Sequence, residues 1–284
     1  KFRDAMDKIG LESARSAVAH SEAEALEALR DFARRSRDEP EDDAQALRLL
    51  SLDEEFHERL AALSGNGELV RALRAKGIAK ADKSDVDGAI GDYSQALRLD
   101  GSDPDYLNSR AQAYEAKNDL DRALADYNQS IRANPSQVFA YNNRGAAYQR
   151  KGDFARAAAD YGEVTKLQPN NVDAWNARCW VRAVSNQAQQ ALADCDQALK
   201  IKADSPDALD TRGFVYLKLN QTDSAMKDYD AALKLDPKLA GSLYGRGVAK
   251  TRKGDRNGGT ADINAAKAIR GDIAEEFGRY GIKP

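Results

Sequence analysis

The chain has 284 residues, of which 42% are hydrophobic and 31% are charged, a balance typical of a soluble globular protein rather than a disordered one. A formal net charge of −3 gives no reason to expect a nucleic-acid partner. No apolar run approaches the roughly 20 residues that span a bilayer, and no signal peptide precedes the first helical pattern, so we expect no membrane partner and a cytoplasmic location by default. Two cysteines and two histidines are too few for a disulfide framework or a four-ligand zinc site, so no metal or cofactor is expected.

Residues 1–69 have the pattern of three helices followed by a fourth that continues into the rest of the chain. A capping box that begins at Ser21 opens the second helix. Pro40 and the acidic residues after it open the third, which ends near Gly65. No helix breaker follows Glu68, so we expect a small helical bundle joined to the next region through one continuous helix.

The end of this bundle carries a recognisable motif. Its residues are Asp53, Phe56 and His57, followed by Ser64, Gly65 and Asn66 before a leucine-rich helix. The stretch resembles the FCD effector domain of GntR-type transcription regulators. In that family the Asp and His help to hold a metal together with two later histidines, but no histidine follows His57 here. We therefore expect a partly solvated Asp53–His57 pair rather than a metal site, in a truncated domain.

A repeat with a period of 34 residues begins at Val70. Its six units are 70–103, 104–137, 138–171, 172–205, 206–239 and 240–273, and 274–284 is a short segment expected to cap the array. The eighth position is small in every unit, the twentieth is Ala or Gly, and the twenty-fourth is Tyr in four units. Small residues at these positions let two helices of one unit approach closely. The turn signals between the helices and the prolines near the end of several units separate the elements.

These columns resemble the tetratricopeptide repeat (TPR), and the resemblance covers residues 70–273. It implies an all-α fold, a right-handed superhelix of helix pairs whose concave groove is lined mainly by the first helix of each unit. In the last unit, Asn257, Gly258 and Gly259 fall inside the second helix, so we expect looser packing there.

Two other sets of residues have structural interpretations. An arginine at the seventh position could form a basic ladder for an acidic ligand, but an aspartate recurs at the twenty-third position, so an ion-pair network within and between repeats is the simpler explanation. Cys179 and Cys195 occupy the eighth and twenty-fourth positions of one unit. We expect them to be buried and reduced rather than a redox switch.

The resemblance also indicates which positions face the groove. The candidates are Asn108, Asn142, Asn143, Arg150, Asn176, Trp180, Phe214, Lys218 and Arg252. Asparagine can donate to and accept from an extended peptide backbone, and arginine can bind a carboxylate through two parallel hydrogen bonds. This chemistry suits an acidic or C-terminal peptide, although the two-carboxylate clamp of chaperone-binding members is not reproduced column by column.

Three functions remain open. The first is a non-enzymatic protein–protein interaction scaffold that forms a homodimer through residues 1–69, in which an engineered fusion would explain the join of two helical families. The second is an adaptor that binds a peptide in the groove, and the third is a fragment of a metal- or metabolite-sensing regulator. An enzyme is the least supported class, because the sequence has no phosphate loop, no nucleophile elbow, and only His20 and His57 as histidines.

Overall fold

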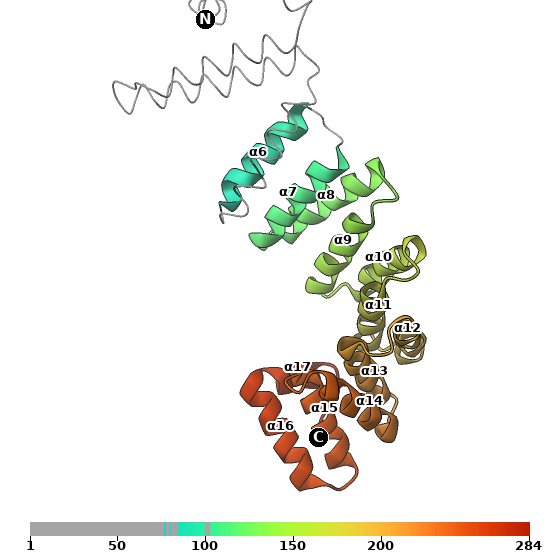
Figure 1. Cartoon of the computed structure of the whole chain (residues 1–284). Coiled ribbons are helices and arrows are strands. Elements are labelled where there is room, and N and C mark those ends of the chain that lie inside the picture. Colours follow the sequence, from blue (N-terminus) through green and yellow to red (C-terminus); the bar gives the residue numbers. More distant parts are fainter. Residues whose placement is uncertain (1–76, 78–79, 81–84, 100–102) are drawn as a thin grey trace, which may run out of the picture. The chain divides into compact units, whose positions relative to one another are not determined.

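A computed structural model describes residues 77, 80, 85–99 and 103–284, and all regular elements in this part of the chain are helices (Figure 1). The chain divides into two compact units, Lys1–Ala113 and Tyr114–Pro284. The boundary falls inside helix α7 (Pro104–Ala116). The bundle, the continuous helix and the Asp53–His57 pair expected from the sequence lie outside the described residues.

The described part of the first unit contains α6 (Val86–Leu99) and most of α7 (Pro104–Ala116). Ala96 and Leu97 of α6 form a small buried cluster with Tyr106 and Leu107 of α7. Arg110 Nη1 donates to Ser94 Oγ across the same pair of helices, at 3.1 Å. Apolar contact and one polar contact therefore join α6 to the helix that follows it.

The second unit consists of helices that recur with the sequence period. They are α8 (Leu120–Ala133), α9 (Val138–Arg150), α10 (Phe154–Leu167), α11 (Val172–Val184), α12 (Ala188–Ile201), α13 (Pro206–Lys218), α14 (Thr222–Leu235), α15 (Ala240–Arg252), α16 (Arg256–Ile269) and α17 (Ile273–Arg279). The first helices α9, α11, α13 and α15 begin 34 residues apart, and so do the second helices α10, α12, α14 and α16.

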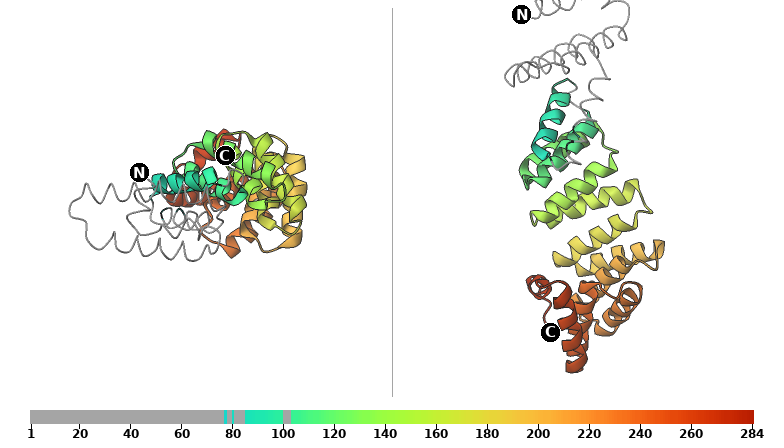
Figure 2. Two further views of the ribbon diagram at one scale, coloured as in Figure 1. Left: turned by 90° about the horizontal axis from the view of Figure 1, so that it is seen from above. Right: turned by 60° about the vertical axis from the view of Figure 1, so that its left-hand side comes forward.

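Helices of the second unit form two layers, and the successive pairs follow one another from green to red in Figure 2. Each second helix packs against its own first helix and against the first helix of the next pair. The first helices α11, α13 and α15 also pack directly on one another, whereas successive second helices do not pack closely. Closer spacing in the first-helix layer curves the stack toward that layer, so its open surface is the concave face.

The turn between the helices of a pair has a fixed backbone geometry. In the five turns that the structure describes, the fifteenth position is Asn or Gly and has a positive φ: Asn118 (58°), Gly152 (76°), Asn186 (62°), Asn220 (57°) and Gly254 (94°). These two residue types enter the left-handed region at the least cost. In three turns the next residue is an aspartate whose side chain accepts a hydrogen bond from the first turn of the second helix.

Contact between paired helices depends on small residues at the eighth position. The Tyr161 ring lies against Gly145, where an added Cβ atom would be 3.0 Å from the ring. In the last pair an added Cβ on Gly247 would lie 2.7 Å from the carbonyl oxygen of Gly259. The looser packing expected for this pair is wrong: two facing glycines let the backbones of α15 and α16 approach more closely, and α16 is continuous.

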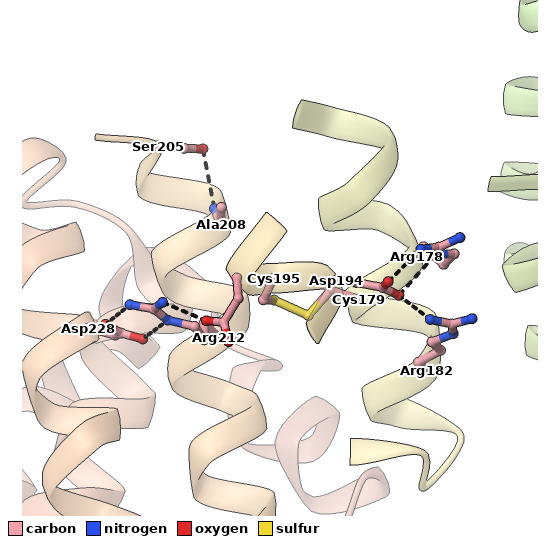
Figure 3. Close-up of a disulfide and its surroundings, with 10 residues drawn as sticks. Arg178, Cys179, Arg182, Asp194, Cys195, Ser205, Ala208, Arg212 and Asp228 are labelled. Carbon is pink, nitrogen blue, oxygen red and sulfur yellow. Dashed lines mark hydrogen bonds and ion pairs between the residues drawn. A yellow bond between two sulfur atoms is a disulfide. The ribbon is translucent and has the colours of Figure 1, made fainter. Parts of the chain in front are cut away.

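The two cysteines correct another prediction. Cys179 of α11 and Cys195 of α12 are both buried, as expected, but they form a disulfide with a Cα–Cα distance of 5.4 Å (Figure 3). The prediction of reduced thiols is wrong because the eighth and twenty-fourth positions face each other across the helix pair, within the distance that a disulfide bridges. The bond covalently joins the two helices of this repeat.

The arginine and aspartate columns form the ion-pair network that the sequence predicts. Arg178 donates from Nε and Nη2 to the two carboxylate oxygens of Asp194, and Arg212 does the same with Asp228 (Figure 3). The third nitrogen reaches the preceding second helix, as in the 2.8 Å contact from Arg212 Nη1 to Asp196 Oδ1. Two parallel bonds within a repeat and one bond between repeats leave these arginines unavailable as a ladder for an acidic ligand.

Candidate peptide-binding face

One side of α9 presents polar and aromatic side chains on the concave face. Phe139, Asn143, Ala146 and Arg150 are three or four residues apart, which places them on one helical stripe, and Asn142 lies beside them, three residues after Phe139. The opposite side of α9 carries its buried residues. Phe139 is 74% exposed, the largest exposure among large apolar side chains of the described residues, so this stripe offers apolar surface beside amide groups.

Asn176 lies at the equivalent position of α11, 34 residues after Asn142. Its side-chain carbonyl oxygen is buried and accepts no hydrogen bond from any described residue. A buried acceptor without a donor is costly. Because this oxygen has almost no accessible surface, a peptide N–H could reach it only after the Asn176 side chain turned outward.

Arg150 is held by residues of the preceding turn. Its Nη2 atom donates to Asn118 Oδ1 at 2.9 Å, and its Nη1 atom lies 3.4 Å from a carboxylate oxygen of Glu115. The guanidinium thus already binds a carboxylate of the same chain. An external carboxylate at this position would have to compete with Glu115.

Lys218 and Arg252 bind main-chain carbonyl groups at the C-terminal end of the array. Lys218 Nζ donates to Asn186 Oδ1 at 2.9 Å and to the carbonyl oxygen of Tyr280 at 2.8 Å, and burial lowers its pKa. Arg252 donates from Nη1 to the carbonyl oxygen of Leu217 and from Nη2 to that of Lys283, both at 3.2 Å. These two residues hold the end of the chain on the concave face.

The candidates Trp180 and Phe214 lie in an aromatic cluster with Phe277 and Tyr280. The Tyr280 ring lies edge-on to Trp180 at a centroid distance of 5.6 Å, and Phe277 lies edge-on to Phe214 at 5.4 Å. Phe277 also packs against Tyr244 of α15 at 4.7 Å. Phe214 is only 1% exposed as a result. The concave face of α11, α13 and α15 is therefore covered by α17 and the residues after it.

The nine candidates thus fall into separate groups. Asn142, Asn143, Arg150 and Asn176 belong to the α9–α11 surface, whereas Trp180, Phe214, Lys218 and Arg252 contact the C-terminal segment. Asn108 belongs to neither group: it lies on α7 in the first unit and is half-buried.

Two features of this face were not predicted from the sequence, the exposed Phe139 and the contacts of the C-terminal segment. Phe139 occupies a groove-facing second position, and an aromatic residue there was a usable signal. The C-terminal contacts had no such signal, because Phe277 and Tyr280 lie outside the repeat columns and contact residues 62 to 100 positions earlier.

Other kinds of site are not found in the part of the chain that the structure describes. No group of three His, Cys, Asp or Glu side chains there has an arrangement that could hold a metal ion. None of the described helices combines the length and the apolar character needed to cross a membrane. The concave face remains the strongest candidate site.

Comparison with protein families agrees with this geometry. Models described as tetratricopeptide repeat match residues 74–138 and 138–171, and a model described as TPR repeat matches residues 213–254. The chain therefore contains tetratricopeptide repeats, followed in the described residues by the helix pairs of that family. A model of the FCD domain matches residues 3–76, so the two families meet within the same few residues of the chain.

Solved structures show the same fold as the TPR solenoid. A TPR protein from Parabacteroides merdae has a TM-score of 0.65 with 19% identity, over 75% of this chain and 90% of its own. PilF of Pseudomonas aeruginosa has a TM-score of 0.61 with 17% identity, over 75% and 98% of the two chains. YrrB, described as a TPR protein with an unusual peptide-binding site, has a TM-score of 0.51 with 22% identity, over 63% and 93%. A search of curated protein sequences finds no match.

Proposed function

We propose that the chain is a non-enzymatic protein-interaction scaffold whose TPR solenoid binds an extended peptide on the α9–α11 surface. The observation that carries this proposal is the exposed Phe139 ring beside the exposed Asn142 side chain on one stripe of α9. An apolar ligand side chain would cover the ring, and ligand backbone N–H groups would donate to Asn142, and to Asn176 once its side chain turned toward the ligand. The peptide-binding site named for YrrB, which shares the fold, supports a ligand of this kind.

The structure changes the expected ligand chemistry. An acidic or C-terminal carboxylate is less favoured on this surface, because Arg150 already binds Glu115 and Asn118. Recognition through backbone amides and one apolar side chain needs no displacement of existing ion pairs. We therefore propose a peptide with an exposed apolar anchor rather than an acidic cluster.

A phage-displayed library of random peptides, selected on the full chain, tests the proposal. We expect selected peptides to lose at least about tenfold in affinity with Phe139→Ala or Asn142→Ala, since anchors of an interface carry most of its energy. Leu235→Ala is the matched control, because Leu235 is 49% exposed but lies on α14 of the second-helix layer. Peptides that depend on Leu235 and ignore Phe139 and Asn142 would overturn the proposal.

The family match over residues 3–76 supports a second, separate part of the scaffold hypothesis, a homodimer formed through residues 1–69. The adjoining FCD and TPR matches also agree with the interpretation of two fused helical families. Light scattering of the full chain over a concentration series tests the dimer. A mass that stays at one chain at all concentrations would exclude it.

The disulfide favours an oxidising compartment over the cytoplasm expected by default. Disulfides persist in secreted and periplasmic proteins and are rare where thiols are kept reduced. We propose that the scaffold works in such a compartment. Mass spectrometry after alkylation of the protein in its native cells would test this: labelled free thiols at Cys179 and Cys195 would contradict it.

A further inference from the structure

The C-terminal segment, Ile273–Pro284, occupies the concave face as a bound peptide would. Its Phe277 and Tyr280 side chains are three residues apart and insert among Trp180, Phe214 and Tyr244, which belong to three successive first helices. Ile282, two residues after Tyr280, is also buried in the same core. The segment contacts side chains from α11, α13 and α15, whereas a simple cap would contact only the last pair.

The polar contacts of the segment with Lys218 of α13 and Arg252 of α15 are made by its main chain. Lys218 and Arg252 donate to the carbonyl oxygens of Tyr280 and Lys283. Every peptide offers such carbonyl groups, so these two contacts do not require this particular sequence. Specificity then comes from the apolar positions, namely an aromatic pair spaced by three and an apolar residue two positions further on.

The segment also has the properties of an exchangeable element. Helix α17 has only seven residues, and a helix of that length is not stable on its own in water. Its order therefore depends on contacts with the face and on local pairs such as Arg270 with Glu276 at 2.7 Å.

We infer that residues 273–284 are an internal ligand, and that a partner peptide with the pattern Phe-x-x-Tyr-x-Ile binds the α11–α15 face when this segment is displaced. The inference deepens the proposed function, since it names a partner chemistry and a means of regulation for the same solenoid. It concerns a different part of the concave face, so it can hold even if the α9–α11 surface binds nothing.

A fluorescently labelled synthetic peptide of the sequence GDIAEEFGRYGIKP, corresponding to residues 271–284, tests the inference by fluorescence anisotropy. The full chain is compared with its Phe277→Ala/Tyr280→Ala variant, in which the segment is weakened but the face is intact. We expect the peptide to bind the variant at least about tenfold more tightly than the unmodified chain, because the internal segment competes at high effective concentration.

Matched controls separate this effect from general loosening of α17. Glu275→Ala/Arg279→Ala changes two exposed residues of α17, leaves the net charge unchanged, and should bind the peptide as weakly as the unmodified chain. A peptide in which Phe and Tyr are replaced by Ala should not bind the opened variant. Adding Lys218→Ala to that variant should weaken binding, since it removes the donor to the Tyr280 carbonyl. Equal binding to all forms, or no binding to the opened variant, would overturn the inference.

Hydrogen exchange of the unmodified full chain gives a test that does not depend on the folding of any variant. Amides of residues 274–282 should exchange by local opening, faster than the protected amides in the middle of α13 and α15. Exchange of the segment at the same rate as α13 would show an integral part of the core rather than an internal ligand. That result would also overturn the inference.

Discussion

Two neighbouring repeats fill the same space between paired helices by different means. In the α13–α14 pair the Tyr229 ring lies over Gly213, where an added Cβ would be 2.7 Å from the ring. In the α11–α12 pair Cys179 and Cys195 occupy the equivalent positions and form a disulfide. The helices pack as pairs in both cases, so the space between them must be filled by side chains, but no particular residue type is required. Only the second solution depends on the redox environment.

Reduction of the disulfide gives the largest expected effect. The bond links residues 16 positions apart. A cross-link that closes a loop of this size restricts the unfolded chain, and its loss lowers the free energy of unfolding by about 3 kcal/mol in the chain-entropy account. Urea unfolding of the unmodified chain, followed by circular dichroism, should therefore shift to lower urea when a phosphine reductant is present. An unchanged midpoint, with both thiols shown to be free, would contradict the prediction.

The Cys179→Gly/Cys195→Phe variant is the matched control, because it converts this pair to the glycine–aromatic type of its neighbours. Phe is preferable to Tyr because Ala183, at the twelfth position, cannot accept a hydrogen bond from a hydroxyl group. This variant should keep the same unfolding midpoint with and without reductant.

Gly245→Ala tests the packing of the Tyr229 ring against the next first helix. Tyr229 also lies against Gly245 of the next first helix, where an added Cβ would be 2.2 Å from Cζ of the ring. Overpacking of this kind costs about 2–3 kcal/mol, which thermal unfolding would detect as a lower Tm. Gly162→Ala is the control: its added Cβ would be 3.4 Å from the nearest side-chain atom, so α10 should be as stable or slightly more stable.

The difference between these repeats also shows what the sequence could reveal. The 34-residue period, the glycine and tyrosine columns and the paired Arg178 and Asp194 were readable because each is repeated and local. Oxidation of Cys179 was not, because a small residue at the eighth position fits either a thiol or a disulfide. The correct inference required the distance between the two cysteines.

The candidate site was less predictable than the fold. The first-helix positions predict a binding face, but they do not predict that Arg150 is bound to Glu115 or that Phe214 is covered by Phe277. Both facts depend on contacts between repeats or with the chain end, which no column of the repeat encodes. Family positions therefore locate a face, and only the structure shows which part of it is open.

The α13–α14 pair, which contains Tyr229, also has a residue that should make its stability depend on pH, namely Asp210 of α13. Burial raises the pKa of Asp210 to about 6, and the nearby carboxylates of Asp207 and Glu276 also raise it. The Ser242 hydroxyl, which donates to Asp210 at 2.6 Å, and the charge of Arg270 act in the opposite direction. Because the folded chain then holds this proton more tightly than the unfolded chain, its contribution to stability is greatest below about pH 4. That contribution falls as the pH rises toward 6.

Asp210→Asn should remove this dependence. We expect the free energy of unfolding of the unmodified chain, relative to the variant, to decrease by about 2 kcal/mol between pH 4 and pH 7. Denaturation at a series of pH values measures the difference, in which the carboxylates common to both chains cancel. A difference that is constant over this range would show that Asp210 ionises normally in the folded chain.

The smallest effect is expected from the tyrosine hydroxyl groups, and it distinguishes repeats that share the same ring position. Tyr127 donates to Glu115 at 2.8 Å, whereas the hydroxyl of Tyr229 is buried with no hydrogen-bond partner among the described residues. Glu115 and Leu217 occupy the same twelfth position of their repeats, and leucine cannot accept a hydrogen bond. The environment of the hydroxyl group is thus decided by one residue on the first helix.

Tyr127→Phe should lower the free energy of unfolding by about 1 kcal/mol, because it removes a hydrogen bond to a charged group. Tyr229→Phe removes a buried hydroxyl that has no partner, so its effect should be neutral or stabilising. The two substitutions delete the same atom from fully buried rings at equivalent positions, and parallel urea titrations compare them directly. Equal losses in both variants would mean that Tyr229 has a partner in solution, and the pairing at the twelfth position would then not explain the difference between the repeats.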